Sequence, residues 1–455
     1  MNGTAGTGGT GAGCPSRPVR AAARGASRPR GPHHVAVVGA GMAAARFARQ
    51  LLALAPDGSA RVTLYGSEPY APYNRTLLTG LLRGRYASGA IALPTGGAAV
   101  RTGTEVVAID PGARTLRTAG GETAAYDTLV LATGAAPVVP DPPGLRTATG
   151  ALRDGVHPLR TLGDRARIAA AVRSGGTAVV VGGGVLGVDA AQALAGAGAA
   201  VHLVHDREHL LNRHLDAGAA GVVRRTLASL GVRVHHEPGV LTALGDDGRI
   251  VGFRLSDGTR LDARAVVLAC GVRPRIDLAR AAGLAVATGV VVDDTLATSA
   301  PRVYAIGDCA EHRNTVHGRA EAAWEQADAL AAALAAELSG APAGPRPPAP
   351  PVLLRLGGGP VDVAAFGDST AAGDDTEVVT LADATRGTYR KLVLRGGVPV
   401  GAILVGDLTT VGDVADAVAR GEPVCCWRWR RPRPRRSPVR TSAPHPADRP
   451  PAVRT

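Results

Sequence analysis

One glycine-rich turn near the start of the sequence has the residue types and spacing of a phosphate-binding loop. The apolar run at residues 35–38 leads into Gly39, Gly41 and Ala44, and an alanine-rich segment with helical spacing follows. A strand, a glycine turn and a helix in this order let the backbone approach a pyrophosphate, which lies on the N–H groups at the helix start. Ala44 replaces a third glycine and is compatible, because that position governs only how closely the helix packs on the strand.

A second turn repeats this arrangement later in the chain. The apolar run at residues 178–181 leads into Gly182, Gly184 and Gly187, and another helical pattern follows. Glycine is common here, with 61 residues, so a single match would be weak evidence. Two matches, each placed after a strand-like run, predict two bound dinucleotides. The simplest pair is a flavin and a nicotinamide coenzyme, and that pair indicates electron transfer.

The residues after the second predicted strand of each unit bear on ribose recognition. An acidic residue about 20 positions beyond such a turn binds a ribose hydroxyl. Glu68, after the predicted strand 61–65, has this position in the first unit. In the second unit the strand 201–204 leads into His205, Asp206 and Arg207. An acid there favours NADH and an arginine favours the 2′-phosphate of NADPH. The sequence leaves both open, with a slight preference for NADH.

The cysteines exclude an internal redox dithiol. The chain has five, and none forms a C-x-x-C or C-x-x-x-x-C pair, so no Fe–S or zinc ligand set is expected either. Cys270 and Cys309 are expected to be buried, and the compartment is expected to be cytoplasmic. We expect no metal site. Several histidines lack any ligand spacing and are expected on helix and loop surfaces: His202, His205, His209 and His214.

The net charge of +13 resides in the two ends of the chain. Residues 1–32 carry five Arg and no acid, and residues 425–455 carry nine Arg and one Asp, which leaves the body near neutral. A nucleic-acid-binding fold needs a basic face on its folded part, so this class is disfavoured. No apolar run reaches the roughly 18 residues of a membrane span, and we expect no membrane partner.

These elements predict an α/β fold with two Rossmann-like dinucleotide-binding domains, the NAD(P) domain being inserted in the FAD domain, and a small α+β domain at the C-terminus. The runs 265–269 and 303–308 are expected to be strands that rejoin the first unit, and a helix is expected over 319–339. The predicted segments are a disordered 1–32, an FAD domain at 33–148 and 265–340, an NAD(P) domain at 149–264, a Pro-rich linker at 341–351, a small domain at 352–424 and a basic disordered tail at 425–455.

Four motifs in order resemble one family. Residues 68–79, Glu-Pro-Tyr-Ala-Pro-Tyr-Asn-Arg-Thr-Leu-Leu-Thr, resemble the segment after the second strand in rubredoxin-reductase-like pyridine nucleotide oxidoreductases. They are most similar to the flavin part of assimilatory nitrite reductase large subunits and of assimilatory nitrate reductase electron-transfer subunits. Thr133-Gly134, Gly307-Asp308 and the run 323–327 (Ala-Trp-Glu-Gln-Ala) are similar to further motifs of that family, and the likeness extends over about residues 34–424.

The resemblance assigns site residues. It places Arg75 beside the flavin pyrophosphate and ring, and Trp324 and Glu325 on a helix that approaches the ring, so these three are the catalytic candidates. The FAD-binding candidates are Gly39, Gly41, Met42, Ala44, Glu68, Arg75, Val107, Thr133, Gly134, Gly307 and Asp308. The NAD(P)-binding candidates are Gly182, Gly184, Val185, Gly187, His205 and Arg207. Gly80 stands where related ferredoxin reductases have a lysine, and Asp189 stands where glutamate is commoner.

The expected activity is hydride transfer from NADH or NADPH to FAD, followed by electron transfer to an external Fe–S or molybdenum protein of nitrate or nitrite assimilation. The Cys clusters of the large nitrite reductases are missing from this sequence, so we do not expect it to reduce nitrite alone. Two alternatives stay open: a reductase of rubredoxin or ferredoxin, and a flavin-binding NAD(P)H sensor with little turnover. A homodimer is among the oligomeric states that the resemblance allows.

Overall fold

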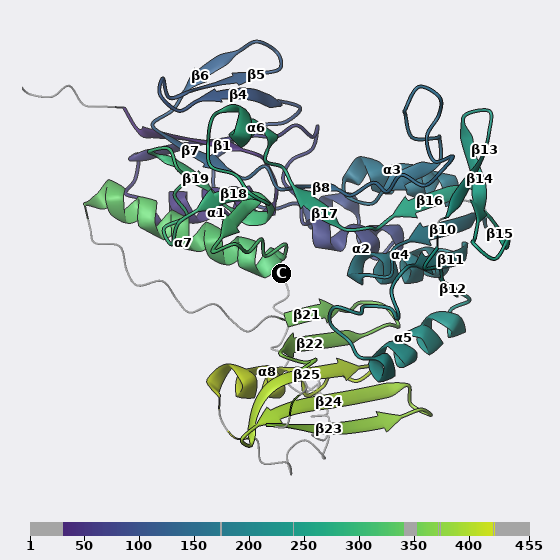
Figure 1. The fold of residues 1–455 in the computed structure, drawn as a ribbon. Helices are drawn as coiled ribbons and strands as arrows, with labels where there is room; N and C mark the ends of the chain where they lie inside the picture. The colour runs from purple at the N-terminus through teal and green to yellow at the C-terminus, as the bar shows by residue number, and fades with distance from the viewer. Residues whose placement is uncertain are drawn as a thin grey trace, which may run out of the picture.

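The computed structural model describes residues 31–172, 175–239, 241–340, 353–371, 373, 375–421 and 423. Figure 1 shows three bodies: one α/β unit on the left, a second in teal on the right, and a small sheet domain below both. This architecture confirms the predicted fold class. The predicted tails and the Pro-rich linker lie outside the described residues, apart from Gly31 and Pro32.

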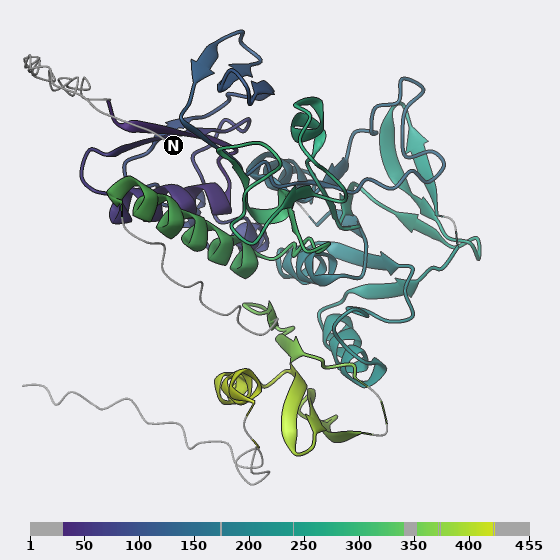
Figure 2. The same ribbon diagram turned by 60° about the vertical axis from the view of Figure 1, so that its left-hand side comes forward.

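The first unit is built on a five-stranded parallel sheet. Its elements are β1 (His33–Val38), α1 (Met42–Leu54), β2 (Ala60–Tyr65), β3 (Ala99–Arg101), β7 (Thr128–Leu131), β19 (Val303–Ala305) and α7 (Ala320–Ser339). The strand order is β19-β7-β1-β2-β3, so β1 lies at the centre. Helix α1 buries Phe47, Ala48 and Leu51 at three- and four-residue spacing, as a helix covering a sheet requires. Helix α7 runs beside α1, as Figure 2 shows.

Smaller elements surround this sheet. They are η1 (Arg75–Leu77), α2 (Leu78–Leu82) and η2 (Ser88–Ile91), the antiparallel strands β4 (Val106–Asp110), β5 (Thr115–Thr118) and β6 (Thr123–Ala125), and the later α6 (Asp277–Ala281), β18 (Val290–Val292), η3 (Gly307–Cys309) and β20 (Ala310–His312). The run predicted at 303–308 therefore does rejoin the first unit, because β19 pairs with β7 in parallel.

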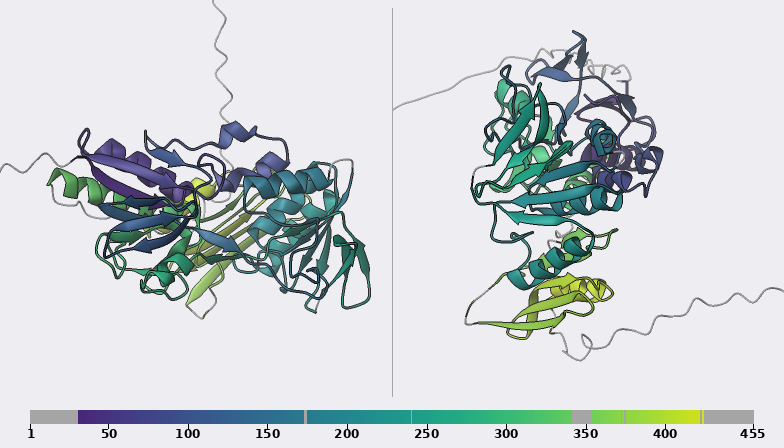
Figure 3. Two further views of the ribbon diagram at one scale, coloured as in Figure 1. Left: turned by 90° about the horizontal axis from the view of Figure 1, so that it is seen from above. Right: turned by 90° about the vertical axis from the view of Figure 1, so that its right-hand side faces the viewer.

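The second unit repeats the design. Its main elements are β9 (Val156–Pro158), α3 (Leu162–Val172), β10 (Thr177–Val181), α4 (Val185–Gly196), β11 (Ala200–His205), α5 (Ala217–Ser229), β12 (Arg233–His236) and β16 (Ala265–Leu268), and its antiparallel strands are β13 (Thr242–Asp246), β14 (Arg249–Arg254) and β15 (Arg260–Asp262). The parallel order is β12-β11-β10-β16-β9. Figure 3 shows this sheet beside the first unit.

One predicted boundary is wrong. The run at 265–269 does not rejoin the first unit, because β16 pairs with β10 in parallel and belongs to the second sheet. A buried apolar strand carries no information about which of two parallel sheets it enters. The chain returns through β17 (Val272–Pro274), which pairs antiparallel with β8 (Ala135–Pro137). The chain passes between the two units through these short strands, so the first unit resumes after about residue 270 rather than at 265.

The small domain is a five-stranded antiparallel sheet with one helix. Its elements are β21 (Leu353–Leu356), β22 (Val363–Gly367), β23 (Thr376–Asp383), β24 (Thr388–Arg395), β25 (Val398–Val405) and α8 (Val411–Arg420). One face packs on α5 of the second unit, as the right panel of Figure 3 shows, and α8 covers the other. Asp216, which caps α5, accepts a hydrogen bond from the Tyr389 hydroxyl at 2.8 Å and lies 3.2 Å from Lys391 Nζ. The chain thus has the small α+β domain that was predicted at its C-terminus.

Candidate functional site

The first glycine turn is shaped to receive a phosphate. Gly39 has a positive φ of 115°, and a side chain there would overlap the Ala132 carbonyl at the end of β7. Gly41 precedes α1 and gives it no side-chain cap, so among the described residues no side-chain cap satisfies the first N–H groups of that helix. A Cβ added at Gly41 would point into open space. Buried Ala44 lies on the face that packs on the sheet. The turn therefore presents free helix N–H groups and a positive dipole end.

The second glycine turn has the same geometry. Gly182 has a φ of 119° and lies against the Ala269 carbonyl, and Gly184 precedes an uncapped α4 with open space in front of it. A side chain at Gly187 would overlap the Gly182 carbonyl oxygen, so only glycine allows α4 to approach this closely. Met42 and Val185 are the first residues of their helices. Each unit thus carries one anion-binding helix start at the carboxyl end of its central strand.

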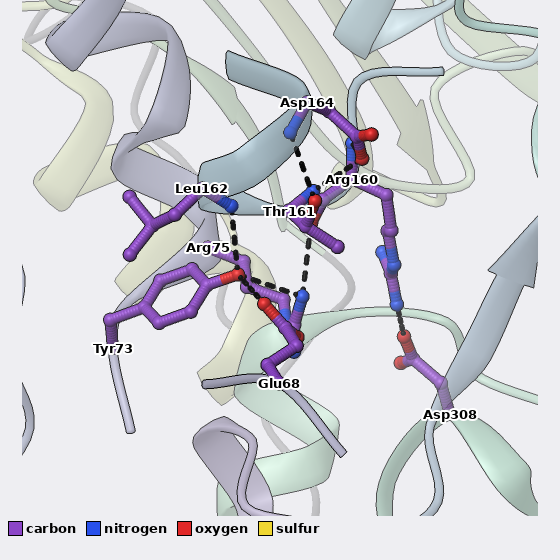
Figure 4. Close-up of polar contacts among 8 residues, drawn as sticks. All are labelled: Glu68, Tyr73, Arg75, Arg160, Thr161, Leu162, Asp164 and Asp308. Carbon is purple, nitrogen blue, oxygen red and sulfur yellow. Dashed lines mark hydrogen bonds and ion pairs between the residues drawn. The ribbon is translucent and has the colours of Figure 1, made fainter. Parts of the chain in front are cut away.

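Two arginine–carboxylate pairs, Arg75–Glu68 and Arg160–Asp308, belong to the cluster that Figure 4 shows. Arg75 pairs with Glu68, and its Nη1 also donates to the Tyr73 hydroxyl and to the Arg160 carbonyl, both at 3.0 Å. Arg160 Nη2 donates to Asp308 Oδ2 at 2.8 Å. The cluster brings together three predicted residues from two motifs, with Glu68 and Arg75 from 68–79 and Asp308 from the Gly307-Asp308 motif. It also joins the two units, because Arg160 belongs to the segment between β9 and α3.

Tyr73 and Arg160 are site residues that sequence reasoning missed. The Tyr73 hydroxyl donates to Glu68 Oε2 at 2.7 Å and accepts from the Leu162 amide at 3.2 Å. Burial is the main cause that raises the pKa of Tyr73. Arg160 is held by Asp164, whose Oδ2 accepts from the Arg160 amide at 3.2 Å. In the sequence, Arg160 is only a basic residue just before a helix. This pattern is too common to identify a site residue.

The Gly307-Asp308 motif lies across from the first turn. Gly307 has a φ of 77°, and a Cβ there would come 3.2 Å from Ala43 of α1. Its amide donates to Gln326 Oε1 at 2.7 Å, so buried Gln326 of α7 fixes this backbone. Gly134 has a φ of 69°, and the Thr133 hydroxyl donates to the Arg275 carbonyl at 2.9 Å. These contacts hold the ends of β7 and β19 at one sheet edge.

Three further candidates lie on the surrounding elements. Trp324 is on α7, and the Arg46 guanidinium carbon lies 5.8 Å from its ring centroid. Glu325 follows it and is partly exposed. Val107 is 41% exposed on β4, and the turn before that strand is bonded to the Glu68 segment, because the Gly103 amide donates to the Glu68 carbonyl at 2.8 Å. The roles of these three residues stay predictions.

The position occupied by lysine in related reductases is closed by an aromatic ring. A Cβ at Gly80 would lie 2.6 Å from Tyr86 Cε2. The nearby carboxylate of Asp189, on α4, accepts from Thr79 Oγ1 at 2.5 Å and from Arg83 Nη2 at 2.6 Å. Arg83 also donates to the Gly358 carbonyl at 2.8 Å, and with the ring and the carboxylate it lines a small cavity. This junction therefore ties α2, α4 and the small domain together.

Two of the histidines near the expected coenzyme ribose site do not lie where they were expected. His202 and His205 lie on strand β11 rather than on a helix or loop, and His205 is buried. Arg207 is exposed and lies 3.6 Å from Asp206. Strand β11 lies between β10 and β12 and its last three residues are all buried, because an inner strand of a parallel sheet is covered on both faces. The surface prediction was therefore wrong for His205. His205 nevertheless lies against the second turn, because a Cβ at Gly183 would lie 2.8 Å from the His205 Cβ. The ribose-reading roles of His205 and Arg207 stay predictions.

The described cysteines are unpaired. Cys309 is fully buried, and burial raises its pKa. Burial likewise raises the pKa of Cys270, to about 11. Within the described ranges no group of three or more His, Cys, Asp or Glu side chains has the arrangement of a metal site. None of the helices in the described part of the chain is long and apolar enough to cross a membrane.

The residues present fit two dinucleotides. Both turns leave a helix start uncapped and an open space where a Cβ would stand, which is the cradle that a pyrophosphate needs. Gly39, Gly41 and the Glu68–Arg75 cluster would hold FAD, and Gly182, Gly184 and the end of β11 would hold NAD(P)H. The fold and this pair of cradles define a flavoprotein reductase with two dinucleotide-binding units.

Comparison with known proteins shows the family. The model of the pyridine nucleotide-disulphide oxidoreductase family matches residues 33–327, and that of the rubredoxin NAD+ reductase C-terminal domain matches residues 356–422. The chain belongs to the pyridine nucleotide-disulphide oxidoreductase family, whose members are oxidoreductases that use FAD and NAD(P)H. The family resemblance found in the sequence is thereby confirmed.

Curated relatives agree with this assignment. The chain is 33% identical to a nitrite reductase [NAD(P)H] of Bacillus subtilis over 80% of its own length and 44% of the relative. It is 31% identical to the assimilatory nitrate reductase electron transfer subunit of the same organism, over 78% and 45%. It is 32% identical to a rubredoxin-NAD(+) reductase of Pseudomonas putida, over 62% and 74%. The chain spans less than half the length of the first two relatives.

Solved structures share the fold. A ferredoxin reductase of Rhodopseudomonas palustris superimposes with a TM-score of 0.70 at 26% identity, covering 82% of this chain and 91% of that one. The covalent putidaredoxin reductase–putidaredoxin complex matches with a TM-score of 0.75 at 23% identity, covering 87% and 95%. The second match supports the fold alone.

Proposed function

We propose that this chain takes electrons from NAD(P)H and passes them through FAD to a separate redox protein. The observation that carries this proposal is the pair of uncapped helix starts, one after Gly41 and one after Gly184, in a sequence without a C-x-x-C or C-x-x-x-x-C motif. FAD, when bound, accepts a hydride from the nicotinamide and can release its electrons to a one-electron carrier.

The residues of the chain contribute position and charge. The two helix starts favour the pyrophosphates. Arg75 and Arg160 are each held by a carboxylate, so both cations are fixed before any ligand binds. Positive charges that are already in place stabilise the negative charge that a bound flavin gains when it is reduced. The raised pKa of Cys270 keeps this thiol protonated at neutral pH, so it does not compete as a nucleophile.

The proposed acceptor is an Fe–S or molybdenum protein of nitrate or nitrite assimilation. The likeness to a nitrite reductase and to a nitrate reductase electron transfer subunit supports this choice. A rubredoxin or ferredoxin as acceptor is the second candidate, favoured by the match of residues 356–422 to the rubredoxin reductase C-terminal domain. A cytoplasmic location and a homodimer complete the proposal.

The test is an acceptor panel with the FAD-loaded protein and saturating NADH or NADPH. Initial rates would be measured with ferricyanide, rubredoxin, a ferredoxin and the catalytic proteins of nitrate and nitrite reduction from the same organism. We expect turnover with ferricyanide and a preference of at least tenfold in kcat/KM for one protein acceptor. Flavin that is reduced by NAD(P)H but never reoxidised by any acceptor would contradict the proposal and favour a sensor.

A further inference from the structure

Two histidines meet at the edge of the second sheet where the nicotinamide coenzyme is expected. His205 ends β11 and His236 ends β12, and the two residues are register partners. Their ring centroids lie 5.4 Å apart with an interplanar angle of 32°. At the same edge the chain leaves β10 through Gly182, whose amide donates to the Val204 carbonyl at 2.8 Å. The histidine pair and the glycine turn are therefore neighbours in space.

His205 packs directly on the glycine turn. A Cβ at Gly183 would lie 2.8 Å from the His205 Cβ and 3.0 Å from its Cγ, so a glycine is required under the imidazole. His205 is only 6% exposed, and its buried Nδ1 has no hydrogen-bond partner within the described residues. A buried polar atom without a partner costs about 1–3 kcal/mol, so a ligand that satisfies the ring is favoured here.

We propose that His205 and His236 read the 2′ position of the adenosine ribose and couple the choice of coenzyme to a proton. The neutral pair hydrogen-bonds the 2′-hydroxyl of NADH, and the protonated pair binds the 2′-phosphate of NADPH. This inference rests on the proposed function, since it requires that the second unit binds a nicotinamide dinucleotide at all.

The charges around the ring set the direction of this dependence. Burial lowers the pKa of His205, and the neighbouring His236 lowers it further, so the ring is neutral at pH 7. Against this, Asp206 and the Arg207 backbone favour the protonated form. The groups that face His205 are Asp206, Arg207, His209 and His236; the Glu237 carboxylate is engaged by the amides of Gly239 and Ser256.

A 2′-phosphate beside the pair shifts this balance. Its negative charge favours the imidazolium, so binding takes up a proton from solvent. With Asp206 nearby and the ring neutral, the phosphate is disfavoured at high pH and NADH is the better ligand. Once a proton is taken up beside the phosphate, the preference moves to NADPH. One proton taken up changes the affinity by up to tenfold per pH unit.

The experiment is a calorimetric titration of the FAD-loaded protein with two probes, 2′,5′-ADP and 5′-AMP, between pH 5.5 and 8. We expect the Kd for 2′,5′-ADP to rise at least tenfold across this range and that for 5′-AMP to change by less than about threefold. The second ionisation of the probe's phosphate, near about pH 6, acts in the opposite direction. Repeating the titration in buffers of different ionisation enthalpy measures the proton taken up.

Three variants test whether the pH dependence comes from His205 and His236 rather than from a neighbouring histidine. H236Q changes an exposed residue and is expected to abolish most of the pH dependence, and H205Q is expected to do the same. The matched control is H235Q, because His235 points to the opposite face of the sheet, where it bonds His202 at 2.9 Å. H235Q is expected to keep the wild-type pH profile.

The outcomes are distinguishable from failure of the proposed function. If 2′,5′-ADP and 5′-AMP both fail to bind at every pH, and NAD(P)H does not reduce the flavin, the proposed function itself fails. If both bind but H236Q retains the wild-type pH profile, the coupling to the histidine pair is overturned. Loss of 2′,5′-ADP binding at all pH values in R207A, with no effect of H236Q, would overturn it in favour of Arg207.

Discussion

Replacing one glycine at a time should separate the two cofactor sites. Gly41 and Gly184 precede their helices with φ values of −90° and −78°, which any residue adopts, and a Cβ at either meets no protein atom within 4 Å. Gly41→Ala and Gly184→Ala should therefore fold. A methyl group in each position occupies the space through which a pyrophosphate approaches the helix start.

The size of the effect follows from the hydrogen bonds at stake. A charge-assisted hydrogen bond contributes about 1.5–3 kcal/mol, and the displaced phosphate loses two of them while recovering part by shifting. A net loss of about 3 kcal/mol corresponds to about a 100-fold rise in Kd. The free energy of unfolding should change by less than about 1 kcal/mol, because the poorer N-cap is offset by the lower entropy of the unfolded chain.

The assay measures both ligands on both variants. Gly41→Ala should be purified with little FAD, and Gly184→Ala should keep stoichiometric FAD but bind NAD(P)H about 100-fold more weakly in calorimetry. Urea unfolding of the apoproteins supplies the stability control. Loss of FAD from Gly184→Ala, or normal FAD content in Gly41→Ala, would refute the assignment of the two turns.

Three further results are expected. Arg83→Ala leaves the partly buried Asp189 carboxylate without its cation and should lower the free energy of unfolding by about 3 kcal/mol in urea titrations. The Arg83→Ala/Asp189→Ala double variant should recover part of this loss. Equal losses in the single and double variants would contradict the ion-pair account. Burial alone would raise the pKa of Asp216, but hydrogen bonds from the Ala219 amide, Tyr389 and Lys391 outweigh it, so the pKa is lowered. The carboxylate therefore stabilises the folded protein fully above its unfolded pKa, and this stabilisation is lost as pH falls through the folded pKa. The unfolding free energy of Asp216→Asn should depend less on pH below about pH 4, and an unchanged acid profile would contradict this. Cys270, with a pKa of about 11, should remain unalkylated by iodoacetamide at pH 7 in peptide mass spectra, and rapid labelling in the folded protein would contradict its protonated, half-buried state.

The sequence predicted those features that follow from local rules. A glycine directly after a strand-like run and before a helical pattern predicts a dinucleotide turn from the sequence alone. In the structure, Gly39 and Gly182 have the positive φ that such a turn requires. The helix expected over 319–339 likewise coincides with α7. These elements are determined by residues a few positions apart, so spacing is enough to find them.

Features that depend on tertiary pairing were not accessible in this way. Strand β16 has the same apolar composition whichever parallel sheet it enters, and only its pairing with β10 fixed the domain boundary. Arg160 joins Arg75 and Asp308 across long sequence separations, and nothing near it in the chain indicates this. The burial of His205 likewise follows from its place at the end of an inner strand.

The most direct test of the account is rapid anaerobic mixing of the FAD-loaded protein with NADH or NADPH, followed by addition of an oxidised acceptor. The account predicts that the flavin absorbance band bleaches with at least one coenzyme and returns when the acceptor is added. A flavin that neither coenzyme bleaches would contradict the assignment of the two glycine turns to FAD and NAD(P)H.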